Sequence, residues 1–172
     1  MPLKKPVELP KVPKTRKKNI DKMKSAVPEK KKDAIEYTIK TYFRYDKVQK
    51  KQFYVISLFT VKEFSFLTYE ISVNVSKTKN AIEISLLGLN ARQSCLVEAK
   101  NAFTDLFFEN LYGKHTISFI KQDGSINSFL VDYNIFKKEI IILQDTSPKK
   151  KNNRTFCTFD VDHTLFSFAR GE

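Results

Sequence analysis

The chain has 172 residues, which is room for one domain of ordinary size plus tails. Hydrophobic residues make up 41% and charged residues 29%, so at least part of the chain can bury a core. Four glycines and two cysteines exclude a collagen and a disulfide-framed mini-protein, and no apolar run approaches the roughly 20 residues of a membrane-spanning helix.

Most of the net charge of +12 lies in the first 33 residues, which hold 11 Lys and 1 Arg against 4 acidic residues. The same segment holds five of the six prolines and few large apolar residues. Ordering a backbone costs about 1–2 kcal/mol per residue, and this segment has little apolar surface to bury in return. Residues 1–33 are therefore predicted to be a disordered basic arm.

An alternation of apolar and polar residues begins at Ile35 and is typical of β-strands with one buried face. The segments that show it, or that are dense in β-branched and aromatic residues, are 35–45, 53–61, 69–76, 82–86, 115–121, 126–133 and 139–143. Asp123-Gly124 is the clearest turn signal between them. We expect residues 34–146 to form a mainly β domain, an antiparallel sandwich or partly open barrel of about seven strands.

Residues 91–112 fit two structures. One helical face would contain Leu96, Ala99, Phe103, Leu106 and Asn110. Ser94 could cap the start of that helix and Gly113 could end it. The alternative is a further strand around Ala102–Phe108 in an all-β fold. We favour the helix, which would make the domain α+β with one helix near residues 95–112.

The basic arm suggests a polyanionic partner. Each lysine that neutralises a phosphate releases a counterion, which gives affinity that depends on salt and not on sequence. Lysine outnumbers arginine by 26 to 5, which argues against readout of specific bases. A second basic run follows Pro148 and could extend the same surface. The residues predicted to contact nucleic acid are Lys4, Lys5, Lys11, Lys14, Arg16, Lys17, Lys18, Lys22, Lys24, Lys30, Lys31, Lys32, Lys149, Lys150, Lys151 and Arg154.

We therefore predict a non-catalytic accessory module that binds nucleic acid or a ribonucleoprotein surface. The alternative is a protein-interaction or structural β-domain with a solubilising arm. In either case residues 147–172 are predicted to be a basic linker and a terminal apolar segment that docks on the core or on a partner. In the alternative function, Phe156–Phe168 adds a strand to a partner sheet. An acidic membrane surface is a third partner for the arm, weakened by the lack of an anchoring apolar helix.

The string Asp160-Val-Asp162-His-Thr164 resembles the first motif of the haloacid dehalogenase superfamily. The resemblance implies an Asp160 nucleophile, an Asp162 acid/base and a bound Mg²⁺. In that family the motif opens a Rossmann-like domain, whereas here eight residues follow Thr164. We therefore expect no enzyme, and a short strand or hook at this position.

The remaining chemical signals are weak. Exposed aromatic rings could stack bases, and the candidates are Phe64, Phe66, Tyr42 and Tyr112, although core packing is the expected role of most aromatics here. Two His and two distant Cys do not have zinc spacing, so no metal or cofactor is predicted. No apolar segment typical of an export signal follows the basic start. We thus expect a cytoplasmic protein, or a nuclear one if the source is eukaryotic.

Overall fold

The computed structural model describes residues 32–65, 67–92, 99–149 and 153–169. Almost all of the predicted basic arm lies outside these ranges. The described elements are β1 (Tyr37–Asp46), β2 (Lys51–Phe64), β3 (Thr68–Lys77), β4 (Ala81–Arg92), β5 (Lys100–Phe108), β6 (Gly113–Lys121), β7 (Ile126–Asn134), β8 (Glu139–Asp145), β9 (Cys157–Val161) and a 3₁₀ turn, η1 (His163–Leu165).

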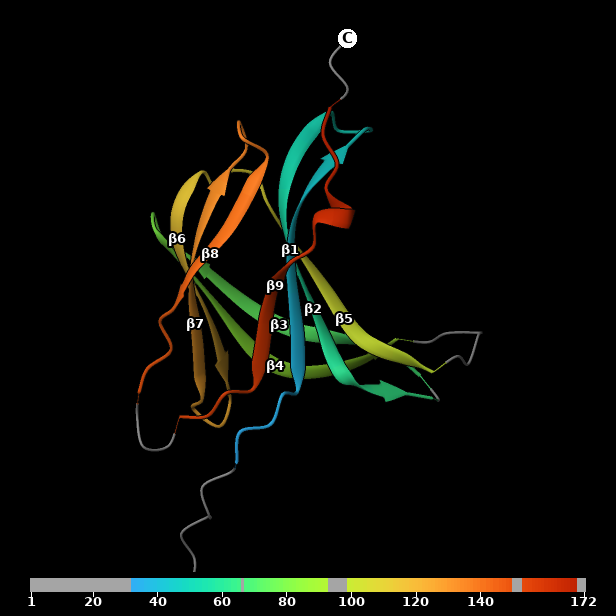
Figure 1. The fold of residues 1–172 in the computed structure, drawn as a ribbon. Helices are drawn as coiled ribbons and strands as arrows, with labels where there is room; N and C mark the ends of the chain where they lie inside the picture. The colour runs from blue at the N-terminus through green and yellow to red at the C-terminus, as the bar shows by residue number, and fades with distance from the viewer. Residues whose placement is uncertain (1–31, 66, 93–98, 150–152, 170–172) are drawn as a thin grey trace, which may run out of the picture. The chain divides into compact units, whose positions relative to one another are not determined.

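The strands form one sheet in the order β8-β7-β6-β4-β3-β5-β2-β1-β9, which curls into a nearly closed, barrel-like domain (Figure 1). The sequence-neighbour pairs are antiparallel, and three pairs are parallel: β1 with β9, β3 with β5, and β4 with β6. The prediction of a mainly β, barrel-like fold is confirmed. The described residues contain nine strands instead of about seven, and the two additional ones are β5 and β9.

The alternating pattern of β1 becomes one wall of the core. Ile39 and Phe43 are fully buried and point into the barrel, opposite Leu58 and Tyr54 of β2. Across the interior, the buried hydroxyl of Tyr133 on β7 lies 3.0 Å from Thr41 Oγ1. Because a buried hydroxyl without a partner is costly, this hydrogen bond favours the observed placement of β7 relative to β1.

The helix favoured near residues 95–112 is wrong for the described part of that segment. β4 runs to Arg92 and β5 spans Lys100–Phe108, while residues 93–98 lie outside the described ranges. Ala102 and Thr104 are buried, whereas Phe103 and Phe107 are each 48% exposed, so the true period is two. Gly113 does not end a helix. It is the first residue of β6, and its φ of 87° is one that favours glycine.

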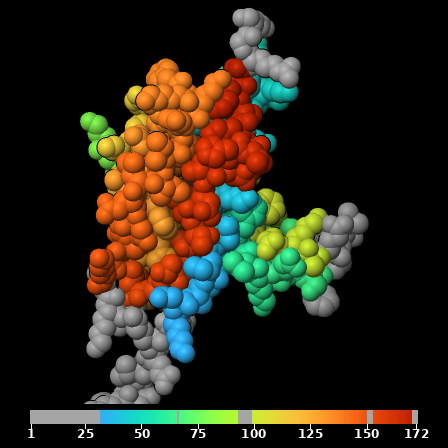
Figure 2. All heavy atoms as spheres, in the orientation of Figure 1, coloured from blue at the N-terminus to red at the C-terminus, as the bar shows by residue number. Residues whose placement is uncertain are grey.

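The terminal apolar segment completes the sheet. β9 pairs in parallel with β1, in a register that sets Ile39 beside Phe159. The Phe159 ring also packs on Phe129 of β7, at 5.3 Å between centroids. Figure 2 shows the segment (red) lying between β1 (blue) and the β7–β8 region (orange). The expectation that this segment docks on the core is thus confirmed, and the sheet extends past the expected boundary at residue 146.

Candidate functional site

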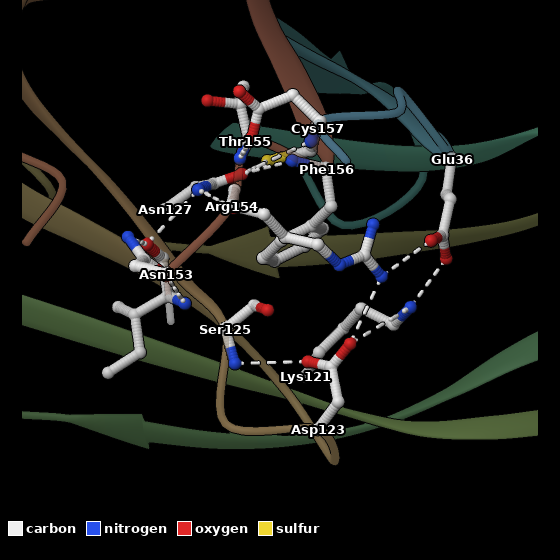
Figure 3. Close-up of polar contacts among 12 residues, drawn as sticks. Glu36, Lys121, Asp123, Ser125, Asn127, Asn153, Arg154, Thr155, Phe156 and Cys157 are labelled. Carbon is white, nitrogen blue, oxygen red and sulfur yellow. Dashed lines mark hydrogen bonds and ion pairs between the residues drawn. The ribbon is translucent and has the colours of Figure 1, made fainter. Parts of the chain in front are cut away.

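Two ends of the β-domain carry most of its polar chemistry. The first, here called the closing end, is where the chain enters β1 and where β6 turns into β7. A cluster of four charged side chains lies there, and we call it the closing cluster: Glu36, Lys121, Asp123 and Arg154 (Figure 3). Arg154 Nη2 lies 2.6 Å from Glu36 Oε1 and 3.0 Å from Asp123 Oδ2. Lys121 Nζ lies 2.5 Å from Glu36 Oε2.

The electrostatics of the closing cluster favour its charged forms. Burial alone would raise the pKa of Asp123, but hydrogen bonds from Ser125 and Arg154 and the charge of Lys121 hold that pKa well below its usual range. Burial likewise opposes ionisation of Glu36, and hydrogen bonds from Lys121 and Arg154 lower its pKa overall. The Arg154 side chain is only 4% exposed, so both carboxylates are needed to compensate its desolvation.

Asn127 of β7 ties the terminal segment to the barrel beside this cluster (Figure 3). Its Oδ1 accepts hydrogen bonds from the backbone N–H groups of Phe156 and Cys157, at 2.9 and 3.1 Å. Its Nδ2 donates to the carbonyl of Arg154 at 3.0 Å. One buried amide side chain therefore replaces a stretch of strand ladder between β7 and the segment that leads into β9.

The closing end fits a structural role. Its groups are turned toward one another, and the adjacent thiol of Cys157 is buried, which raises its pKa to about 12. A thiol in that state is a poor nucleophile at neutral pH. Arg154 was predicted to contact phosphate, but its guanidinium already serves two carboxylates inside the domain. The structure thus gives Arg154 a role within the fold.

The string that resembles a haloacid dehalogenase motif lies at the end of β9. Asp160 is exposed, and Asp162 caps η1, its Oδ1 accepting from Thr164 N at 3.1 Å. Asp162 Oδ2 lies 2.8 Å from Lys40 Nζ. Hydrogen bonds from Lys40 and Thr164 lower the pKa of Asp162 to about 2. In the described part of the chain, Asp162 thus acts as a cap and an ion-pair partner.

Within the described ranges, no three or more His, Cys, Asp or Glu residues come together in a way that could hold a metal ion. His115 is buried, and its Nε2 lies 3.2 Å from the carbonyl oxygen of Tyr112. Nor does any helix of the described residues have the length and apolar character to cross a membrane.

The opposite end, here called the basic end, gathers the β1–β2, β3–β4, β5–β6 and β7–β8 connections. Two contacts join three of these connections: Lys51 Nζ lies 2.8 Å from Glu109 Oε1, and Lys77 Nζ donates to the carbonyl of Asn110 at 2.8 Å. Residues 44–51, 77–80, 109–114 and 134–139 form this end and contain nine basic residues against three acidic ones. Figure 1 shows the β1–β2 and β7–β8 turns at the same, upper end of the domain.

Most cations of the basic end have no carboxylate partner in the described part of the chain. Among the described residues, no carboxylate lies within ion-pair distance of the basic groups of Arg44, Lys47, Lys50, Lys114 and Lys137. The tight turns hold these lysines outward. Lys50 has a φ of 53°, and Asp46 Oδ1 accepts from the N–H groups of Val48 and Gln49 in the same turn. The end therefore presents uncompensated positive charge to solvent.

Aromatic rings are exposed at the same end. Tyr112 is 60% and Phe136 84% exposed, and their rings pack edge to face at 5.6 Å between centroids. Of the four aromatics proposed from sequence as stacking platforms, Tyr112 is thus confirmed as exposed. Tyr42 is buried, Phe64 is half-buried against Tyr69, and Phe66 lies outside the described residues.

The described ranges contain three of the sixteen residues predicted to bind nucleic acid. Lys32 and Lys149 are exposed, and Arg154 is buried. The others, Lys4 to Lys31 together with Lys150 and Lys151, lie outside the described residues, so their role stays a prediction.

Sequence reasoning missed the basic end because its lysines come from four separate turns. Each turn contains only one to three of them, which is ordinary for a solvated loop. The signal that could have found them is topological: where consecutive strands run in opposite directions, every second connection lies at the same end of the sheet. Phe107 was not predicted as a site residue because a helix was favoured for residues 91–112. Its exposed position on a strand therefore could not be inferred.

Comparison of the chain with protein-family models, with curated proteins and with solved structures gives no match.

Proposed function

We propose that this chain is a non-catalytic binding protein that contacts nucleic acid, or a ribonucleoprotein surface, through phosphates. The observation that carries the proposal is the basic end, where nine basic residues face three acidic ones and most cations have no carboxylate partner in the described chain. The Lys-rich residues 1–33 add a further excess of positive charge in the sequence. A cytoplasmic or nuclear location would suit such a partner and a free buried thiol at Cys157.

A role in protein interaction has less support. That alternative uses Phe156–Phe168 as a strand for a partner sheet, but Cys157–Val161 already pairs with β1 of its own domain. Phe166 also packs on Phe43, at 5.1 Å between ring centroids, so the hook is occupied within the chain. By contrast, Lys47, Lys50, Lys114 and Lys137 of the basic end have no carboxylate partner in the described chain.

The test measures binding of the full-length protein to fluorescently labelled single-stranded RNA and DNA by anisotropy, over about 50–200 mM salt. The Lys50→Gln/Lys137→Gln variant removes two unpaired cations from the basic end. The control, Lys62→Gln/Arg92→Gln, removes the same charge from the end of the domain where β2 and β4 finish. A third variant, Lys14→Gln/Lys17→Gln/Lys18→Gln, tests the Lys-rich segment in the whole chain.

Steep salt dependence is expected for the wild type, because each phosphate contact contributes about 0.7 to the slope of log K against log salt for a single strand. The Lys50/Lys137 variant should lose about 1.4 of that slope and roughly tenfold in affinity, while the Lys62/Arg92 control should change little. Absence of binding at low salt overturns the proposal. Equal losses in the two double variants would show that net charge alone acts, and would remove the basic end from it.

A further inference from the structure

A groove opens at the basic end, between the β1–β2 turn and the end of β5. Its volume is about 610 Å³, and its walls are Arg44, Tyr45, Asp46, Lys47, Val48, Gln49, Phe53, Phe107 and Glu109. Two aromatic rings form part of the wall: Phe53 and Phe107 pack edge to face, with 5.8 Å between centroids. The space is large enough for one planar ring of nucleobase size with its sugar and phosphate.

The Phe107 ring is presented to solvent by the register of the sheet. On β5, Ala102 and Thr104 point inward, so Phe107 points outward beside Val55 of β2. Its side chain remains 48% exposed, and it does not belong to the barrel core. Exposing a large aromatic ring forfeits the stabilisation of burying it, so the ring at this position suits contact with a partner.

The charges in the groove favour an anionic occupant. The guanidinium carbon of Arg44 lies 5.8 Å from the centroid of the Phe107 ring, and Lys47 is on the same wall. The acidic groups of the groove are already engaged: Asp46 accepts hydrogen bonds from its own turn, and Glu109 pairs with Lys51. Phosphate therefore finds two cations that have no carboxylate partner in the described chain.

From these features we infer that the groove is a stacking site for one base of a single-stranded nucleic acid, with Phe107 as the platform and Arg44 and Lys47 as phosphate contacts. This inference rests on the proposed function and specifies the class of nucleic acid. A ring face is accessible in a single strand and hidden in a duplex, so a stacking site selects the single strand. The balance of exposed aromatic surface and free cations is the combination that such sites use.

The experiment combines a protein variant with a change in the ligand. Phe107→Leu removes the ring and keeps an apolar side chain, and Phe103→Leu is the matched control. Phe103 is on the same strand and face and equally exposed, but it lies outside the groove, where it packs on Phe59. The full-length wild type and both variants are titrated with a single-stranded DNA, the same sequence as a duplex, and an abasic strand with the same phosphates.

Phe107→Leu should weaken single-strand binding about fivefold to a hundredfold, the range of one lost base stack, and leave the salt slope unchanged. Its affinity for the duplex and the abasic strand should match the wild type, and Phe103→Leu should behave as wild type throughout. Thermal unfolding of both variants checks that the fold is intact.

The two proposals fail in different ways. If the wild type binds nucleic acid with a steep salt slope but Phe107→Leu loses nothing, the groove is not a stacking site and the phosphate-binding function stands. An equal loss on the single strand and the abasic strand also overturns the stacking inference, because no base contact was removed. Arg44→Gln gives an independent check: it should lower the salt slope by about 0.7, and an unchanged slope overturns its role. If no nucleic acid binds the wild type, both proposals fall together.

Discussion

In the closing cluster Lys121 and Arg154 both have carboxylate partners, whereas most cations of the basic end have none in the described chain. Two phenylalanines show the same contrast. Phe156 at the closing end is fully buried, while Phe136 at the basic end is 84% exposed. The same residue types therefore stabilise the fold at one end and are available to a partner at the other. Composition alone does not distinguish the two roles, because they differ in whether the fold places a partner group beside the side chain.

The largest effect on the free energy of unfolding is expected at Phe156. Its ring is fully buried and packs edge to face on Tyr37, at 6.4 Å between centroids. Phe156→Ala should lower the free energy of unfolding by about 3–5 kcal/mol, the usual cost of such a cavity. Urea unfolding followed by circular dichroism measures it. A loss below about 1 kcal/mol would show that the terminal segment contributes little to the fold.

Asn127→Ala should have the next largest effect. It leaves the backbone N–H groups of Phe156 and Cys157 without their acceptor in a buried place, and each unpaired group costs about 1–3 kcal/mol. We expect a total loss of about 2–4 kcal/mol in the free energy of unfolding. Asn74→Ala on the exposed side of β3 is the matched control and should stay within about 0.5 kcal/mol. Similar losses in both variants would contradict the closing role of Asn127.

The closing cluster also predicts how stability responds to acid. Asp123 and Glu36 have pKa values that are lowered in the folded state, so the folded state holds these protons less tightly than the unfolded chain does. Their contribution is therefore complete above the unfolded values, about pH 4, and is lost as the pH falls below them. Urea unfolding at a series of pH values should show stability falling from about pH 5 downward.

Asp123→Asn tests the source of that response. The variant should lose about 1 kcal/mol at neutral pH, since the ion pair is partly exposed to solvent, and its stability should fall less steeply in acid. A pH profile as steep as that of the wild type would assign the acid response to other carboxylates. Asp162 is one such group, because its pKa of about 2 is also lowered.

The sequence predicts the part of this fold that depends on local pattern. The alternation through Ile39 and Phe43 and the Asp123-Gly124 turn identified strands and a hairpin that the structure confirms. Residues 100–108 were misread because apolar residues at Ala102, Leu106 and Phe108 satisfy a period of two, while a different subset satisfies a helical spacing. Pairing with neighbouring strands favours the pattern of period two, and the sequence of one segment does not reveal which strands will lie beside it.

The candidate site was less accessible to sequence reasoning. Of the sixteen cations that the sequence predicts to bind nucleic acid, the structure describes three, and one of these, Arg154, is buried between two carboxylates. Its partners, Glu36 and Asp123, lie 118 and 31 residues away in the chain. Likewise, Arg44 and Phe107 meet only because β1, β2 and β5 are adjacent in the sheet. The residues at both ends are brought together by the order of the strands in the sheet, which the local pattern of residues does not reveal.

The smallest effect on stability is expected at Phe136, and it is the most direct test of the difference between the two ends. Phe136→Ala makes the same change as Phe156→Ala, but at a turn tip where the ring is 84% exposed and its partner is the exposed Tyr112. Little apolar surface becomes buried around it on folding, so the free energy of unfolding should change by no more than about 0.5 kcal/mol. Urea unfolding of the two variants under identical conditions measures the contrast. A loss above about 1 kcal/mol at Phe136 would mean that the ring is packed in the fold, and the basic end would then resemble the closing end. A negligible loss in the free energy of unfolding would show that the ring does not stabilise the fold, as expected for a side chain that contacts a partner.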